Sequence, residues 1–282
     1  MECSTDARNV KVSSISDLVC SLCIKANTVL GTNVVEAMNK ALSKERSPIG
    51  REIIGELIEN AEIASKNSIA MCQDTGISVV YVEIGHDVHL VGGDLYEAIN
   101  EGVRRGYTDG YLRKSVVSDP LFSRTNTKDN SPAVVHVKLV EGNEVKVTVA
   151  PKGAGSENMS VVQMLTPSSG IVGVKKVILD CVKRAGANSC PPMAIVGVGI
   201  GGTMEKAAEL SKESLLRPIG SRNPDERYAN LEEELLREIN DTGIGPGGLG
   251  GTVTARPPTH IACLPVAVNI QCNACRHASG VI

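Results

Sequence analysis

The sequence predicts a mixed α/β fold in which helices pack around small β-sheets. Apolar residues recur at helical spacing in several segments, β-branched runs typical of strands lie between those segments, and glycine-rich loops adjoin several of the strands. A chain of 282 residues can bury a large core. We find no internal repeat and no low-complexity linker, so we expect residues 1–282 to form a single domain, which could be organised as two lobes.

Helical spacing of apolar residues predicts helices over 33–45, 47–67, 94–107, 170–187, 204–216 and 231–240. In the second of these, Ser47 is the expected cap and Pro48 occupies the first helical position. The strands are expected over 77–85, 194–202 and 261–272. Residues 133–151 alternate on both sides of EGNE and predict a β-hairpin, preceded by a long polar loop over 118–133.

The composition narrows the class of protein. The net charge of −3 does not suggest a surface for nucleic acid. No run reaches the roughly 18 apolar residues of a membrane span, and the N-terminus has no secretion signal pattern. We therefore expect a cytoplasmic protein without a membrane partner, in which most of the nine cysteines are thiols.

MCQDTG, residues 71–76, places a thiol, an amide and a carboxylate next to one another. The motif lies in a loop between a predicted helix and a predicted strand, where protein scaffolds commonly present reactive groups. Such a loop could combine a metal-binding sulfur with groups that bind a polar substrate.

Two glycine-containing motifs have alternative interpretations. Gly197, Gly199 and Gly202 match the dinucleotide-binding pattern G-x-G-x-x-G, with Asp225 at a suitable distance. No clear second βαβ unit accompanies this pattern. Two other interpretations are therefore possible: a glycine loop that approaches another anion or a cluster, and a purely structural turn. KGAGSEN, residues 152–158, could bind a carboxylate or phosphate with its backbone N–H groups, or could be an ordinary helix start capped by Ser156.

The cysteines differ in their surroundings. Cys20-x-x-Cys23 and Cys272-x-x-Cys275 have the spacing of zinc ligands, but Cys20 and Cys23 lie in an apolar helical stretch and are expected to fill the core. Cys72, Cys190 and Cys272 instead lie beside polar or loop-forming residues. Three thiolates from distant loops could hold an iron–sulfur cluster and leave one iron open as a Lewis acid.

CQDTG, KGAGSEN, SCPPMAIVGVGIGGT and THIACLPVAVNIQCNACRHA, in this order, resemble the class I, iron–sulfur-dependent fumarate hydratases and L(+)-tartrate dehydratases. The resemblance extends from about residue 30 to the C-terminus. It is strongest to the α subunit of the two-subunit enzymes, which is equivalent to the N-terminal domain of the single-chain enzymes.

The resemblance implies a [4Fe-4S] cluster held by Cys72, Cys190 and Cys272. It also implies substrate contacts from the following residues: Gln73, Asp74, Arg113, Gly155 and His260. Arg113 would pair with a carboxylate, the backbone at Gly155 would lie against the substrate, and His260 would donate a hydrogen bond or a proton. The glycines of GVGIGG would then serve close backbone approach near the cluster.

The resemblance further implies a reversible hydration of fumarate to malate, with L(+)-tartrate dehydration as the alternative. The chain ends soon after Cys272, whereas the family's proposed catalytic base lies in a C-terminal domain. We therefore expect a separate β subunit in a hetero-oligomer, and weak or no activity without it. Asp74 is an alternative base. Cys275 is either a competing ligand or a small residue that fills space. The rival from another class is a non-catalytic subunit that carries zinc or a cluster.

Overall fold

The computed structural model describes residues 7–186, 195–244, 250–255, 259–272 and 274–282. The chain divides into two compact units. Unit 1 comprises Met1–Leu30, Ala61–Gly153 and Arg276–Ile282, and unit 2 comprises Gly31–Asn60 and Ala154–Cys275. Each unit combines helices with a small β-sheet, which confirms the predicted fold class.

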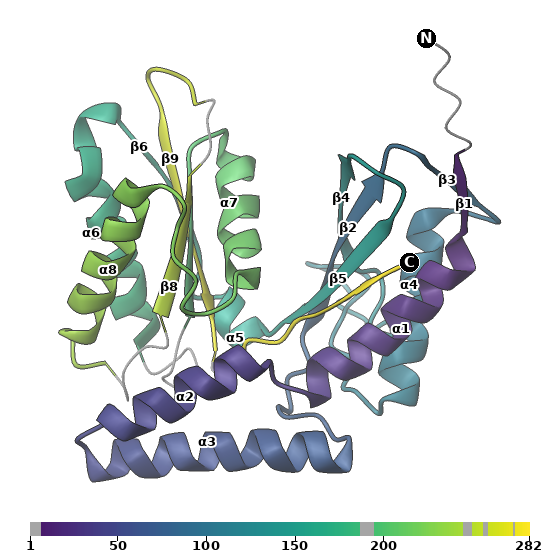
Figure 1. Cartoon of the computed structure of the whole chain (residues 1–282), viewed down its shortest axis with the longest axis horizontal. Helices are drawn as coiled ribbons and strands as arrows, with labels where there is room; N and C mark the ends of the chain where they lie inside the picture. The colour runs from purple at the N-terminus through teal and green to yellow at the C-terminus, as the bar shows by residue number, and fades with distance from the viewer. Residues whose placement is uncertain (1–6, 187–194, 245–249, 256–258, 273) are drawn as a thin grey trace. The chain divides into compact units, whose positions relative to one another are not determined.

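Unit 1 is built on a four-stranded sheet of order β10-β5-β2-β4, on which helices α1 and α4 pack (Figure 1). Its elements are β1 (Arg8–Lys11), α1 (Val12–Thr28), β2 (Ile77–Gly85), β3 (Val88–Val91), α4 (Leu95–Asp109), β4 (Val134–Val140), β5 (Val145–Lys152) and β10 (Ala278–Val281). Val80, Val82 and Ile84 of β2 belong to the core shared with both helices. On the intervening positions of β2, Tyr81 stacks on His136 of β4. This alternation is expected of a sheet with one face packed against helices.

The expected β-hairpin over 133–151 is wrong in its pairing, although both of its strands exist. β4 and β5 do not pair with each other, because β2 lies between them, parallel to β4 and antiparallel to β5. The turn between β4 and β5 crosses the end of β2, where the N–H of Gly85 donates to Glu144 O at 2.9 Å. A Cβ on Gly85 would lie 2.2 Å from Gly142 O, so glycine is required beneath the turn.

Unit 2 contains a second four-stranded sheet, of order β6-β9-β7-β8. Its strands are β6 (Val161–Leu165), β7 (Ile195–Ile200), β8 (Gly250–Ala255) and β9 (Leu264–Gln271), and its helices include α2 (Thr32–Lys44), α5 (Ala154–Glu157), α6 (Gly170–Ala185), α7 (Met204–Glu213) and α8 (Glu226–Asn240). Helix α7 lies on one side of this sheet and helices α6 and α8 on the other (Figure 1). Short 3₁₀ helices occur at Pro167–Ser169 and Ser214–Leu216.

Several helix starts follow the sequence signals. Helix α3 (Pro48–Asn67) begins as predicted, and Ser47 Oγ accepts the N–H of Gly50 at 3.3 Å. In KGAGSEN, Ser156 does not cap a helix, which differs from one of the two interpretations of this motif. Helix α5 has one turn with Ser156 inside it, and the β-branched pair that opens β6 follows after three residues.

One stretch among the described residues, Val12–Lys44, is long and apolar enough to cross a membrane by length and composition alone. It contains two separate helices, α1 and α2. Ile15, Val19 and Leu22 of α1 lie in the core of unit 1, so packing against the sheet accounts for their apolar character.

Candidate functional site

Three sequence motifs meet at one end of the sheet of unit 1. β5 pairs with β2 so that Lys152 lies opposite Ile77, and β10 pairs with β5 so that Ala278 lies opposite Val149. Because both pairings are antiparallel, the CQDTG loop before β2, the segment after β5 and the segment before β10 converge. Residues distant in sequence therefore lie together at this end.

The CQDTG loop approaches β5 closely. Asp74 Oδ1 accepts the N–H of Gly76 at 3.0 Å, which closes a tight turn within the loop. Gly76 has a φ of +71°, and a Cβ there would lie 2.6 to 2.8 Å from backbone atoms of Lys152. Glycine thus meets both a conformational and a packing requirement.

Buried polar side chains hold the same loop from the other side. The Tyr107 hydroxyl donates to Thr75 O at 2.7 Å, and Asn130 Nδ2 donates to Gly76 O at 3.1 Å. Burial raises the pKa of Tyr107, so the hydroxyl remains a donor. Thr75 Oγ1 donates to Arg113 O at 2.7 Å, which fixes the backbone of Arg113 beside the loop.

Unit 1 contains four of the predicted site residues. Cys72 and Asp74 are half-buried, whereas Gln73 and Arg113 are exposed. The structure thus joins Asp74 and Thr75 of this loop and the Arg113 backbone in one local hydrogen-bond network.

The other predicted residues belong to unit 2 or lie outside the described residues. Gly155 is exposed in α5, and His260 is exposed in a turn where its Nδ1 accepts the Ala262 N–H at 3.2 Å. Cys272 is buried at the end of β9. Cys190 lies outside the described residues.

The described cysteines form no disulfide bonds. Cys23 is completely buried in the core of unit 1, which confirms its expected role as core filler, and burial raises the pKa of its thiol to about 12. Cys20, for which the same role was expected, is only partly buried. Among the described residues, no three His, Cys, Asp or Glu side chains form a group that could hold a metal, but Cys190 is not among them. The thiols of Cys72 and Cys272 fit a cluster in donor chemistry, because iron–sulfur clusters are held by cysteine thiolates.

The glycines of GVGIGG have a packing role. Gly197 and Gly199 lie inside β7, where a Cβ would come within 2.2 Å of Ser211 O and 2.1 Å of Ala207 O. They let α7 pack directly on the strand. Asp225 caps helix α8 and pairs with Arg227. These roles do not support the dinucleotide interpretation; the close backbone approach is that of a helix.

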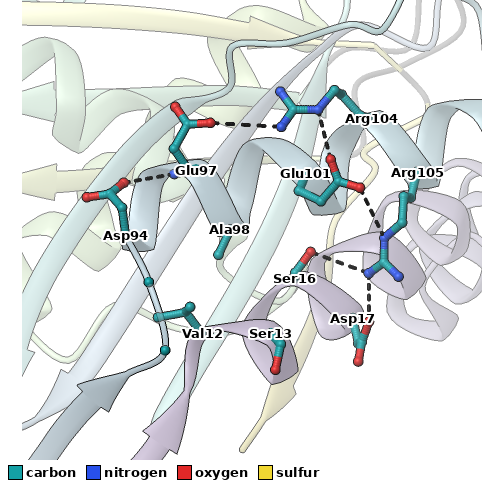
Figure 2. A pocket seen from close by; sticks show the side chains of 12 residues that line it. Val12, Ser13, Ser16, Asp17, Asp94, Glu97, Ala98, Glu101, Arg104 and Arg105 are labelled. Atoms are coloured by element: carbon teal, nitrogen blue, oxygen red, sulfur yellow. Dashed lines mark hydrogen bonds and ion pairs between the residues drawn. The ribbon is translucent and has the colours of Figure 1, made fainter.

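A separate open pocket of about 500 Å³ in unit 1 lies between α1, the turn after β3 and α4 (Figure 2). Its two arginines are ion-paired: Arg104 contacts Glu101, and Arg105 contacts Asp17 at 2.7 Å. The lining contains more carboxylates than guanidinium groups. This pocket is therefore a poor site for a dicarboxylate.

Sequence reasoning did not include Arg276 among the site residues. Arg276 as a whole is 2% exposed, and its Nη1 donates to Asn27 Oδ1 at 3.2 Å. The pairing of β10 with β5 brings Arg276 beside the CQDTG loop. The only local signal was its position four residues after Cys272.

Comparison with known proteins gives the class and then the family. A family model described as fumarate hydratase (fumerase) matches residues 16–281. The chain is 42% identical over 276 residues to a Methanocaldococcus jannaschii protein provisionally named L(+)-tartrate dehydratase subunit alpha, covering 94% of this chain and 96% of that protein. It is 30% identical over 278 residues to the L(+)-tartrate dehydratase subunit alpha of Escherichia coli (strain K12), covering 95% and 90%.

These relatives are hydro-lyase subunits, which defines the class. The chain belongs to the fumarate hydratase (fumerase) family. The designation "subunit alpha" of the relatives implies a partner subunit.

Proposed function

We propose that this chain is the α subunit of an iron–sulfur hydro-lyase that reversibly hydrates fumarate to malate, with a separate β subunit completing the site. The observation that carries the proposal is the convergence of CQDTG, Lys152–Gly153 and Arg276 at one end of a sheet in a member of this family. The chain alone would bind a cluster and turn over poorly.

The cluster ligands in this proposal are Cys72, Cys190 and Cys272. A bound [4Fe-4S] cluster with an open iron supplies a Lewis acid for the substrate hydroxyl. The chain itself contributes orientation. Because Gln73 and Asp74 directly follow Cys72, binding of Cys72 to a cluster would also fix the positions of these two substrate-contacting residues.

Arg113 is the proposed partner of a substrate carboxylate. Its side chain is exposed, while its backbone carbonyl is held by Thr75. A guanidinium on a fixed backbone can bind a carboxylate through two parallel hydrogen bonds. Gly155 and His260 would contribute a close backbone approach and a hydrogen bond or proton, respectively.

Proton transfer at the adjacent carbon would be carried out by a base on the β subunit. Asp74 is the alternative base, and its turn with Gly76 already orients the carboxylate. Asp74→Asn in the assembled complex tests this alternative. Turnover equal to that of the wild type would exclude a proton-transfer role for Asp74.

L(+)-tartrate is the second candidate substrate, favoured by the names of the relatives. Assays of the α–β complex for fumarate–malate interconversion and for oxaloacetate formation from L(+)-tartrate would separate the two. A complex with a bound cluster that acts on neither substrate would contradict the proposed reaction and favour a non-catalytic subunit.

The first experiment is iron and acid-labile sulfide analysis of anaerobically purified chain, together with its visible spectrum. We expect about four of each per chain. Cys72→Ser should lose the cluster, whereas the control Cys20→Ser, on α1, should keep it. One tightly bound zinc and no iron in the wild-type protein would overturn the proposal.

A further inference from the structure

Arg276 is a buried cation at the end of the sheet where the CQDTG loop lies. It is 2% exposed, although arginine is seldom buried unless its charge and hydrogen bonds are compensated. The sequence places it between Cys272 and β10. Its surroundings include at least one group that stabilises the guanidinium, although its Nε is buried without a hydrogen-bond partner among the described residues.

Asn27 of α1 provides one such group. Its Oδ1 accepts from Arg276 Nη1 at 3.2 Å, and its Nδ2 donates to Cys23 O at 2.9 Å. The backbone carbonyl of Asn27 also accepts the N–H of Met71 at 3.0 Å. Met71 immediately precedes Cys72, so Asn27 connects the guanidinium to the start of the CQDTG loop.

Gly153 brings Arg276 and Asp74 to the same small volume. A Cβ built on Gly153 would lie 3.1 Å from Asp74 Oδ2 and 3.6 Å from Arg276 Nη2. The carboxylate and the guanidinium therefore flank the same glycine. Their opposite charges attract each other, and Arg276 is buried whereas Asp74 is half-buried.

We propose that Arg276 is a positioning residue of the active site, which holds the CQDTG loop through Asn27 and orients Asp74 beside Gly153. The catalytic part of this inference rests on the proposed function. Arg276 does not need to touch the substrate. It acts by fixing a loop that carries a proposed cluster ligand and two proposed substrate contacts, where small displacements reduce turnover strongly.

A purely structural role would have different consequences. Arg276 would then join α1 to the C-terminal segment and contribute only to global stability. Its replacement would lower the urea midpoint, but the CQDTG loop of the folded protein would behave as in the wild type. The distinguishing readout is thus local to the loop.

The test compares Arg276→Gln, Arg276→Lys and the control Arg105→Gln in the full chain without cluster. Arg105 is an ion-paired arginine of the same unit, on α4. Hydrogen exchange is measured for a peptide covering 68–76, at urea concentrations where each variant is folded. We expect roughly tenfold or faster exchange in Arg276→Gln, an intermediate rate in Arg276→Lys, and the wild-type rate in Arg105→Gln.

The same variants are then measured in the α–β complex with bound cluster. We expect kcat to fall roughly up to a hundredfold in Arg276→Gln with partial recovery in Arg276→Lys, while KM changes little. Wild-type exchange over 68–76 in a folded Arg276→Gln variant would overturn the positioning role. If that variant does not fold, wild-type exchange in Arg276→Lys would overturn it. Failure of the proposed function would instead appear as an inactive wild-type complex, with the exchange result unaffected.

Discussion

Gly76 provides the sharpest test of the site's packing. In Gly76→Ala, the methyl group meets the Lys152 backbone at 2.6 to 2.8 Å, and the residue must also keep a φ of +71°. The left-handed conformation costs a non-glycine residue about 1–2 kcal/mol. Displacing the packed backbone adds about 1–3 kcal/mol. We therefore expect Gly76→Ala to lower the free energy of unfolding by about 2–5 kcal/mol.

Gly92→Ala is the matched control. Gly92 lies in unit 1 with a φ of +88°, and no atom lies within 4 Å of its added Cβ. It should bear the conformational cost alone, about 1–2 kcal/mol. The difference between the two variants isolates the contact between the loop and β5.

Urea unfolding followed by circular dichroism measures both variants, and hydrogen exchange of β2 and β5 peptides reports on unit 1 alone. With a slope of about 2 kcal/mol per M, the midpoint should fall by about 1–2.5 M in Gly76→Ala and by about 0.5–1 M in Gly92→Ala. Equal losses in the two variants would refute the inferred close approach of CQDTG to β5.

Three further predictions address the surroundings of the site. Tyr107→Phe removes a buried donor to the CQDTG carbonyls and should cost about 1–3 kcal/mol in urea unfolding, whereas Tyr96→Phe, at an exposed position, should change stability by less than about 0.5 kcal/mol. Burial lowers the pKa of His277 in the folded protein below its usual value of 6.5. The contribution of neutral His277 to stability is therefore complete above pH 6.5 and is lost as the pH falls through the lower folded pKa. His277→Gln should flatten that part of the profile of stability against pH, and an unchanged profile would contradict this. In the folded chain without cluster, iodoacetamide should modify the half-buried Cys72 but not Cys23, because burial raises the pKa of the Cys23 thiol. Mass spectrometry of peptides measures both modifications. Equal modification of the two cysteines would contradict the burial of Cys23.

The sequence predicted most helices and half of the described strands, because the periodicity of these segments is local; β1, β3, β6, β8 and β10 were not predicted. Helix α3 begins at the predicted proline, and β2 spans the predicted residues. Strand partners were not predictable in the same way. β4 and β5 have the alternation of a hairpin, but β2, which is rich in β-branched residues, lies between them in the sheet. The one local signal of the central position of β2 is Gly85, which lies beneath the turn that connects β4 and β5.

The candidate site was predictable only where its chemistry is contiguous. CQDTG places its functional groups in one loop, so the sequence alone was enough to predict it as part of a site. Arg276 and Asn27 are 249 residues apart, and they meet because β10 pairs with β5 and α1 packs on the same sheet. A single sequence contains no local pattern for such a contact.

The glycines of KGAG illustrate how one motif can combine two requirements. Gly153 ends a buried segment of unit 1, where a side chain would press against Asp74 and lie against Arg276. Gly155 is exposed in the one-turn helix α5 of unit 2. The first glycine is therefore explained by packing within the chain. The second has a different role in the proposed function, in which its backbone faces a substrate.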